Sequence, residues 1–135
     1  MDKNFFYSKI LLFGEYGIML NSDALSIPFK KFSGYLQKSN LISNKERISN
    51  KKIIELYNYI IKNESLSEII NFQNFKNDIN SGLYFKSNIP IASGLGSSGA
   101  LVSSIINKYS KCLKGFCCRM YFLFFLRIFL TNNFS

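Results

Sequence analysis

Short runs of hydrophobic residues dominate the first third of the chain, and they predict β-strands. Residues 5–13 are rich in aromatic and branched side chains, a composition typical of a strand. Gly14 and Gly17 then interrupt the run with a predicted tight turn. Three further strands are expected at residues 18–20, 24–29 and 32–37, with Pro28 favouring a sheet edge or a strand end. Together these segments predict an antiparallel β meander.

The hydrophobic spacing changes to that of a helix at residues 51–62. Apolar side chains recur there at i, i+1, i+3, i+4, i+7 and i+8 and form one helical face: Ile53, Ile54, Leu56, Tyr57, Ile60 and Ile61. Ser49 or Asn50 is expected to cap the start of this helix. A second, weaker helix is expected at residues 66–77, with Ser65 as its cap and with these residues facing inward: Leu66, Ile69, Ile70 and Phe75.

The second half of the chain adds one strand and one helix. Residues 82–88 alternate, which predicts a strand with Leu83 and Phe85 on one face and Tyr84 and Lys86 on the other. Residues 98–109 predict a helix whose apolar face contains Leu101, Val102, Ile105, Ile106 and Tyr109. The chain has no internal repeat and no linker-like tract, so the expected fold class is α+β.

Composition and charge limit the possible functions. The 135 residues are 47% hydrophobic and 19% charged, which predicts one folded domain rather than a disordered chain. The formal net charge of +9 permits an anionic partner. The absence of histidine excludes Ser-His-Asp and Cys-His nucleophile systems and any histidine general base.

Cysteine usage and the start of the chain favour a reducing compartment. The three cysteines, Cys112, Cys117 and Cys118, fit neither a disulfide framework nor a four-ligand zinc site. Residues 1–13 lack the long apolar stretch and cleavage site of a signal peptide. We therefore expect a cytoplasmic protein without a transmembrane span. The apolar segment at residues 116–130 is also short for a span and contains two arginines.

The segment with the most concentrated chemistry is Pro90–Ala100, which has the sequence PIASGLGSSGA and lies between a predicted strand and a predicted helix. Glycines let the backbone approach a ligand closely and adopt positive φ. The start of the following helix offers unpaired N–H groups and a partial positive charge. This combination predicts an anion site, most naturally one for phosphate, with serine hydroxyls that can donate to phosphate or help to hold Mg²⁺.

Three known glycine motifs do not fit this loop. The Walker A motif needs a lysine directly after its glycines, but the next lysine is Lys108. The dinucleotide motif Gly-x-Gly-x-x-Gly needs an acidic residue about 20 positions later, and no Asp or Glu follows Asp78. The protein-kinase glycine loop needs a Val-Ala-Ile-Lys strand and a His-Arg-Asp loop, and both are absent.

The loop closely resembles the ATP-binding motif of the GHMP kinases, the superfamily of galactokinase, homoserine kinase, mevalonate kinase and phosphomevalonate kinase. The resemblance implies that Gly94, Gly96, Ser97 and Ser98 cradle the ATP phosphates. The whole expected cofactor-binding set is Pro90, Gly94, Leu95, Gly96, Ser97, Ser98, Gly99 and Ala100. Ser98 is the expected Mg²⁺ contact. ATP and Mg²⁺ are therefore the expected cofactors.

A second motif, Ser8–Gly17 with the sequence SKILLFGEYG, resembles the first GHMP motif in its mevalonate and phosphomevalonate kinase form. The resemblance implies that Lys9 lies near the transferred phosphate and that Glu15 and Tyr16 line the substrate pocket. It also implies a ribosomal protein S5 domain 2-like fold, completed in intact enzymes by a ferredoxin-like C-terminal domain. The expected reaction is phosphoryl transfer from MgATP to a small alcohol, with mevalonate as the expected acceptor, in isoprenoid precursor synthesis.

Several pieces of an intact GHMP kinase have no counterpart in this sequence. These are an acidic Mg²⁺ ligand, a catalytic Asp after the ATP loop and a late glycine-rich motif. We therefore expect residues 1–111 to form the ATP-binding domain and residues 112–135 to form an atypical hydrophobic tail, produced by a frameshift or truncation or serving as a membrane-surface anchor. The shortened chain is expected to be poorly soluble and nearly inactive.

Two other functions are compatible with the sequence. The first is a catalytically dead GHMP-like scaffold that retains the fold in order to bind a partner. The second is a basic nucleic-acid module, which would bind in a strongly salt-dependent manner. The scattered lysines disfavour this second function, so no nucleic-acid partner is expected.

Overall fold

The computed structural model describes residues 3–14, 25–40 and 43–111. The expected strand at 18–20 and the hydrophobic tail at 112–135 therefore lie outside the described residues. The described elements are β1 (Phe6–Phe13), β2 (Leu25–Lys38), α1 (Asn44–Lys62), α2 (Glu64–Ser67), α3 (Phe72–Asn80), β3 (Leu83–Ser87) and α4 (Ser97–Tyr109). This mixture of helices and antiparallel strands confirms the α+β class.

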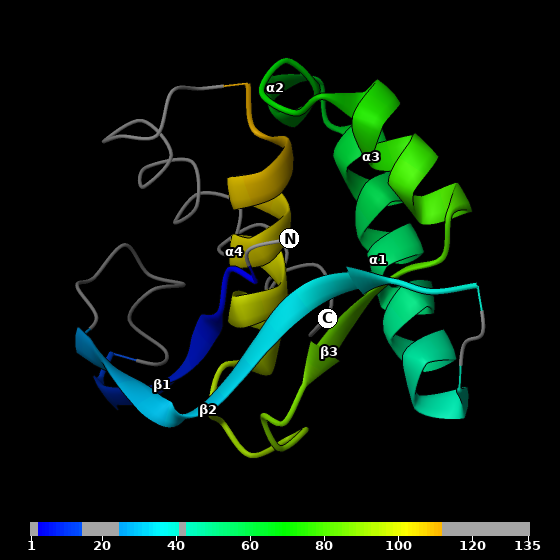
Figure 1. Cartoon of the computed structure of the whole chain (residues 1–135). Helices are drawn as coiled ribbons and strands as arrows, with labels where there is room; N and C mark the ends of the chain where they lie inside the picture. The colour runs from blue at the N-terminus through cyan, green and yellow to red at the C-terminus, as the bar shows by residue number, and fades with distance from the viewer. Residues whose placement is uncertain (1–2, 15–24, 41–42, 112–135) are drawn as a thin grey trace.

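The three strands form one antiparallel sheet in the order β1-β2-β3. Helix α4 packs against β1 and β2, whereas α1 packs against β3, so the helices form a second layer behind the sheet (Figure 1). Helix α3 contacts both α1 and α4. The prediction of paired antiparallel strands in the first third of the chain is confirmed for β1 and β2.

Strand β2 is continuous where the sequence predicted two strands, 24–29 and 32–37. Tyr7 pairs with Ser33 whereas Ser8 pairs with Phe29, so β2 carries extra residues between the two pairs. Such a bulge bends a strand without ending it. The half of β2 before the bulge pairs only with β1 among the described residues, so Pro28 does lie at a sheet edge, where its missing N–H costs nothing.

Helix α1 begins at Asn44, seven residues before the predicted start at 51. Ser43 is its N-cap, and the Ser43 N–H donates to the Glu46 carboxylate at 2.7 Å in a capping box. The predicted caps have another role. The Ser49 hydroxyl accepts from the Phe85 N–H and the Asn50 amide donates to the Leu83 carbonyl, each bond tying α1 to the edge strand β3.

The predicted helix at 66–77 is wrong, because two short helices, α2 and α3, stand in its place. Ile70 between them forms a β-bridge with Ser110, and the Asn71 N–H donates to the Tyr109 carbonyl at 2.8 Å. The Asn71 side chain then caps α3 by accepting from the Asn74 N–H. A tertiary contact with the end of α4 therefore interrupts the helical periodicity.

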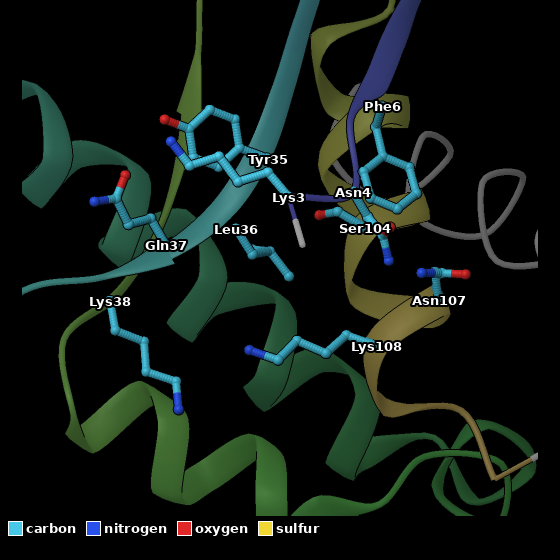
Figure 2. A pocket seen from close by; sticks show the side chains of 10 residues that line it. All are labelled: Lys3, Asn4, Phe6, Tyr35, Leu36, Gln37, Lys38, Ser104, Asn107 and Lys108. Carbon is cyan, nitrogen blue, oxygen red and sulfur yellow. The ribbon is translucent and has the colours of Figure 1, made fainter. Parts of the chain in front are cut away.

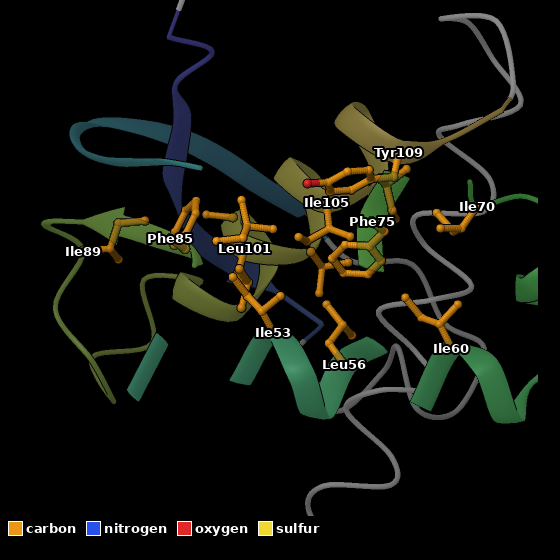
Figure 3. Packing of buried hydrophobic residues seen from close by; sticks show 14 residues of the cluster. Ile53, Leu56, Ile60, Ile70, Phe75, Phe85, Ile89, Leu101, Ile105 and Tyr109 are labelled. Atoms are coloured by element: carbon orange, nitrogen blue, oxygen red, sulfur yellow. The ribbon is translucent and has the colours of Figure 1, made fainter. Parts of the chain in front are cut away.

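The core lies between the helices and the sheet (Figure 3). Its fully buried centre is formed by Ile53, Leu56 and Ile60 of α1, Phe75 of α3, Leu83 of β3 and Ile105 of α4. All five predicted apolar residues of α4 are buried. Ile54 and Ile61, predicted on the same face of α1, are instead exposed, and Tyr84 is buried although the alternation placed it with exposed Lys86.

An ion-pair cluster centred on Asp78 joins α3 to β2 and α4. The Asp78 carboxylate contacts Lys38 Nζ at 2.5 Å and Lys108 Nζ at 2.9 Å, and it accepts a hydrogen bond from the Tyr109 hydroxyl at 2.7 Å. Burial raises the pKa of Asp78, but these three donors outweigh it and hold the pKa at about 2. The cluster therefore stabilises the fold only while Asp78 is ionised.

We expect Asp78→Asn to lower the free energy of unfolding at pH 7 by about 1–2 kcal/mol, allowing for the partial exposure of both lysines. Because the folded pKa is depressed, this stabilisation is complete above the ordinary pKa of 3.8 and is lost as the pH falls towards 2. Urea unfolding at pH 7, 4 and 2.5 checks the expectation. The control is Glu68→Gln, at an exposed carboxylate outside the described ion pairs. A wild-type advantage that is the same at pH 2.5 as at pH 7 would contradict it.

Candidate functional site

The glycine-rich segment forms a loop that connects the end of β3 to the start of α4. Ile89 is buried and anchors the start of the loop, whereas Pro90 and Ile91 are exposed. The Ser33 N–H donates to the Asn88 side-chain oxygen at 2.8 Å, and the Asn88 N–H donates to the Ser33 carbonyl at 3.1 Å. These bonds extend the pairing of β2 and β3 beyond Ser87 and fix the position from which the loop departs.

Three residues of the loop have positive φ: Ala92 at 59°, Gly94 at 73° and Gly96 at 74°. Glycine adopts this conformation readily, whereas alanine is strained in it. The Ser93 hydroxyl stabilises the turn by donating to the Pro90 carbonyl at 2.7 Å. Ala92 and Ser93 are not among the site residues expected from the sequence, because neither residue type signals a left-handed turn by itself.

Lys9 on β1 lies directly against the loop. Its N–H donates to the Leu95 carbonyl at 3.0 Å, so the outer edge of β1 holds the loop through the backbone. The side chain crosses Gly96, where an added Cβ would lie 2.8 Å from Lys9 Cγ. Burial lowers the pKa of the Lys9 ammonium below its ordinary value. The structure thus brings together Lys9 and Gly96, which are 87 positions apart in the sequence.

Helix α4 begins at this loop with Gly96 as its left-handed N-cap. The first helical hydrogen bond runs from the Ala100 N–H to the Gly96 carbonyl at 3.0 Å, so the amides of Ser97, Ser98 and Gly99 remain outside the helical ladder. Ser98 is exposed and Ser97 is half-buried, whereas Gly99 and Ala100 are buried against the core. The free amides and the two hydroxyls can bind an anion at the positive end of the helix.

The space beside Gly94 is open. A Cβ added at Gly94 would meet no heavy atom within 4 Å, whereas the same addition at Gly96 would strike Lys9. A ligand can therefore approach the backbone closely at Gly94, whereas Lys9 occupies the space beside Gly96. Nothing in the described chain fills that approach to Gly94.

Two of the expected site residues cannot be placed. Glu15 and Tyr16, expected to line the substrate pocket, lie outside the described residues. Among the residues that are described, no group of three or more Cys, Asp or Glu side chains could hold a metal ion. No helix in that same part of the chain is long and apolar enough to cross a membrane.

A glycine loop between the last strand and the start of a helix, with a lysine across the loop, is an arrangement that can bind phosphate. Residues 52–116 match the family model of the GHMP kinases N terminal domain. The match covers just under half of the chain and relates this segment to the N-terminal domain of the GHMP kinases, an enzyme family that generally uses ATP and Mg²⁺. The match includes the glycine loop and α4 but not Lys9, Glu15 or Tyr16. No curated protein and no solved structure matched the chain.

Proposed function

We propose that this chain binds MgATP at the Pro90–Ala100 loop as the nucleotide-binding part of a small-molecule kinase with an S5 domain 2-like fold. The observation that carries the proposal is the contact between Lys9 and the loop. The two segments that resemble GHMP motifs meet in space, although only one of them lies in the matched range. A glycine turn that served only to cap α4 would not need a lysine across it.

In this proposal the chain acts by positioning and by neutralising charge. The amides of Ser97, Ser98 and Gly99 would donate to phosphate oxygens, and the Ser98 hydroxyl would contact Mg²⁺. The Lys9 ammonium would stabilise negative charge on the transferred group and lie near the substrate hydroxyl. Bound MgATP would supply the phosphoryl group.

The proposed acceptor is a small alcohol of the mevalonate type. Support comes from the Lys9–Tyr16 segment, whose order Lys-x-x-Leu-x-x-Glu resembles that of mevalonate and phosphomevalonate kinases closely but not fully. Glu15, the acidic residue within that segment, is the proposed acceptor of the hydroxyl proton.

Nucleotide-dependent thermal stabilisation tests the binding part of this proposal. Saturating ATP with Mg²⁺ should raise the Tm of the full chain by several degrees, since a ligand at 100 times its Kd adds about 2.7 kcal/mol. Ser98→Ala should remove most of the rise, and Lys9→Met should weaken it while retaining the hydrocarbon stem against Gly96. Ser103→Ala, in α4 but beyond the loop, is the matched control and should behave as wild type.

Release of ADP in the presence of mevalonate tests the catalytic part. Turnover that depends on both mevalonate and Lys9 supports the kinase function, whereas stabilisation without turnover favours the scaffold alternative. If ATP gives no stabilisation, or if Ser98→Ala and Ser103→Ala behave alike, the proposed nucleotide site is wrong.

A further inference from the structure

A second concave site lies at the other end of α4 from the glycine loop. A cavity of about 640 Å³ opens between the residues before β1, the second half of β2 and the last turns of α4 (Figure 2). Its lining comprises Lys3, Asn4, Phe6, Tyr35, Leu36, Gln37, Lys38, Ser104, Asn107 and Lys108. The α4 residues of the lining lie roughly 10–17 Å along the helix axis from Ser97, so the cavity is separate from the loop.

The charge in this cavity is one-sided. Three of the ten lining residues are lysines and none is acidic. Asp78 is adjacent, but its two oxygens are already engaged by Lys38, Lys108 and Tyr109. Lys3 has no carboxylate partner among the described residues, and its ammonium stands 5.0 Å from the centre of the Tyr35 ring. Three lysines beside one carboxylate leave an uncompensated positive charge of two.

Phe6, Leu36 and the Tyr35 ring give the cavity apolar surface between the charges, and the remaining lining side chains are polar. Leu36 lies between Lys3 and the Lys108 side chain, and Phe6 stands apart near Asn4 and Ser104 (Figure 2). The Asn4 and Asn107 amides can donate or accept hydrogen bonds. Ligand sites in proteins are of this size and combine apolar walls with a few polar groups that fix orientation.

We propose that this cavity binds a small organic anion, with its apolar part against Phe6 and Leu36 and its carboxylate between the lysines. A neutral apolar molecule would leave Lys3 without an anionic partner and the excess positive charge uncompensated, and a bare inorganic anion would leave the apolar surface of Phe6 and Leu36 in contact with water. The site does not depend on the proposed nucleotide site, because the two share no lining residue.

Titration of the ¹⁵N-labelled full chain with 4-phenylbutyrate tests this site, since that probe joins one carboxylate to an apolar body. We expect saturable shifts at the amides of Leu36, Lys38, Ser104 and Asn107. The neutral analogue 4-phenylbutanol and the small anion acetate should each bind at least about tenfold more weakly, because each lacks one half of the interaction.

Lys3→Met and Lys108→Met should each weaken 4-phenylbutyrate binding by about fivefold, consistent with one charge-assisted contact in a partly exposed site. Lys3→Met removes no described ion pair, so it leaves the fold intact. Lys52→Met, on the exposed side of α1, makes the same charge change outside the cavity and should bind as wild type. Ser98→Ala should also bind the probe normally, which separates this site from the glycine loop.

Three results would overturn the proposal. The first is the absence of saturable shifts at the cavity amides at 4-phenylbutyrate concentrations up to about 10 mM, the range expected for a weak site. The second is equal binding of 4-phenylbutanol. The third is an identical loss of binding in Lys3→Met and Lys52→Met. Loss of ATP binding at the loop would leave this test unaffected.

Discussion

Gly96→Ala is expected to reduce ATP binding by at least about tenfold and to destabilise the fold by about 2–3 kcal/mol. The first cause is conformational, because φ is 74° at this position and a left-handed conformation costs an L-residue about 1–2 kcal/mol. The second is steric, because the new Cβ would lie 2.8 Å from Lys9 Cγ and 3.2 Å from Lys9 Cε. Lys9 would have to leave the loop, and the start of α4 would shift with it.

Gly94→Ala is the matched control for this prediction. Its φ is 73°, nearly the same as that of Gly96, but an added Cβ meets nothing within 4 Å. We therefore expect it to show only the conformational cost of about 1–2 kcal/mol. If ligand phosphate approaches the backbone at Gly94, this variant will also bind ATP more weakly. Urea unfolding and ATP titration of both variants give the measurements, and equal stability of the two would refute the role of the Lys9 contact.

Phe75→Ala is expected to destabilise the domain by about 3–5 kcal/mol, the usual loss for a large buried aromatic side chain. The Phe75 side chain is 0% exposed. Its ring stacks on Tyr109 with centroids 4.5 Å apart and meets Tyr57 edge-on at 5.3 Å, so it joins α3 to both α4 and α1. A loss of this size is a large part of the total stability of a small domain, so a substantial fraction of the variant should be unfolded at 37 °C.

Phe72→Ala provides the comparison within the same helix. Phe72 is only partly buried, and its described ring contact is with Tyr57 at 5.9 Å. We expect a loss of about 1–2 kcal/mol, in proportion to the smaller apolar area that it buries. Urea unfolding monitored by far-UV circular dichroism measures both variants. A Phe75→Ala variant no less stable than Phe72→Ala would contradict this description of the core.

Much of the local structure could be predicted from the sequence, because it depends on short-range spacing. The α4 face was predicted correctly, since its apolar residues recur every three to four positions and nothing interrupts them. Strand β1 was predicted within one residue, because its run of aromatic and branched side chains is also a local signal. The glycine loop was recognised from its glycine content, because glycine readily adopts the positive φ that this loop requires.

The errors arose where a distant segment determined a local outcome. The helix predicted at 66–77 is divided because Ile70 and Asn71 bond to the end of α4, about 40 positions later. The predicted caps Ser49 and Asn50 serve β3 instead, because an edge strand leaves backbone groups that side chains can satisfy. Capping residues alone could not reveal this, since several suitable serines and asparagines precede the apolar run.

The sequence by itself determined the fold class, the position of the glycine-rich loop and the positive charge of the chain, because periodicity, glycine content and ionisable groups are local properties. Only the tertiary structure decided that Lys9 lies across Gly96, that Asp78 draws Lys38 and Lys108 together, and that a cavity separates them from Lys3. These pairings depend on how the sheet and helices pack. Packing is set by the shape of the whole core, and no short stretch of sequence contains that information.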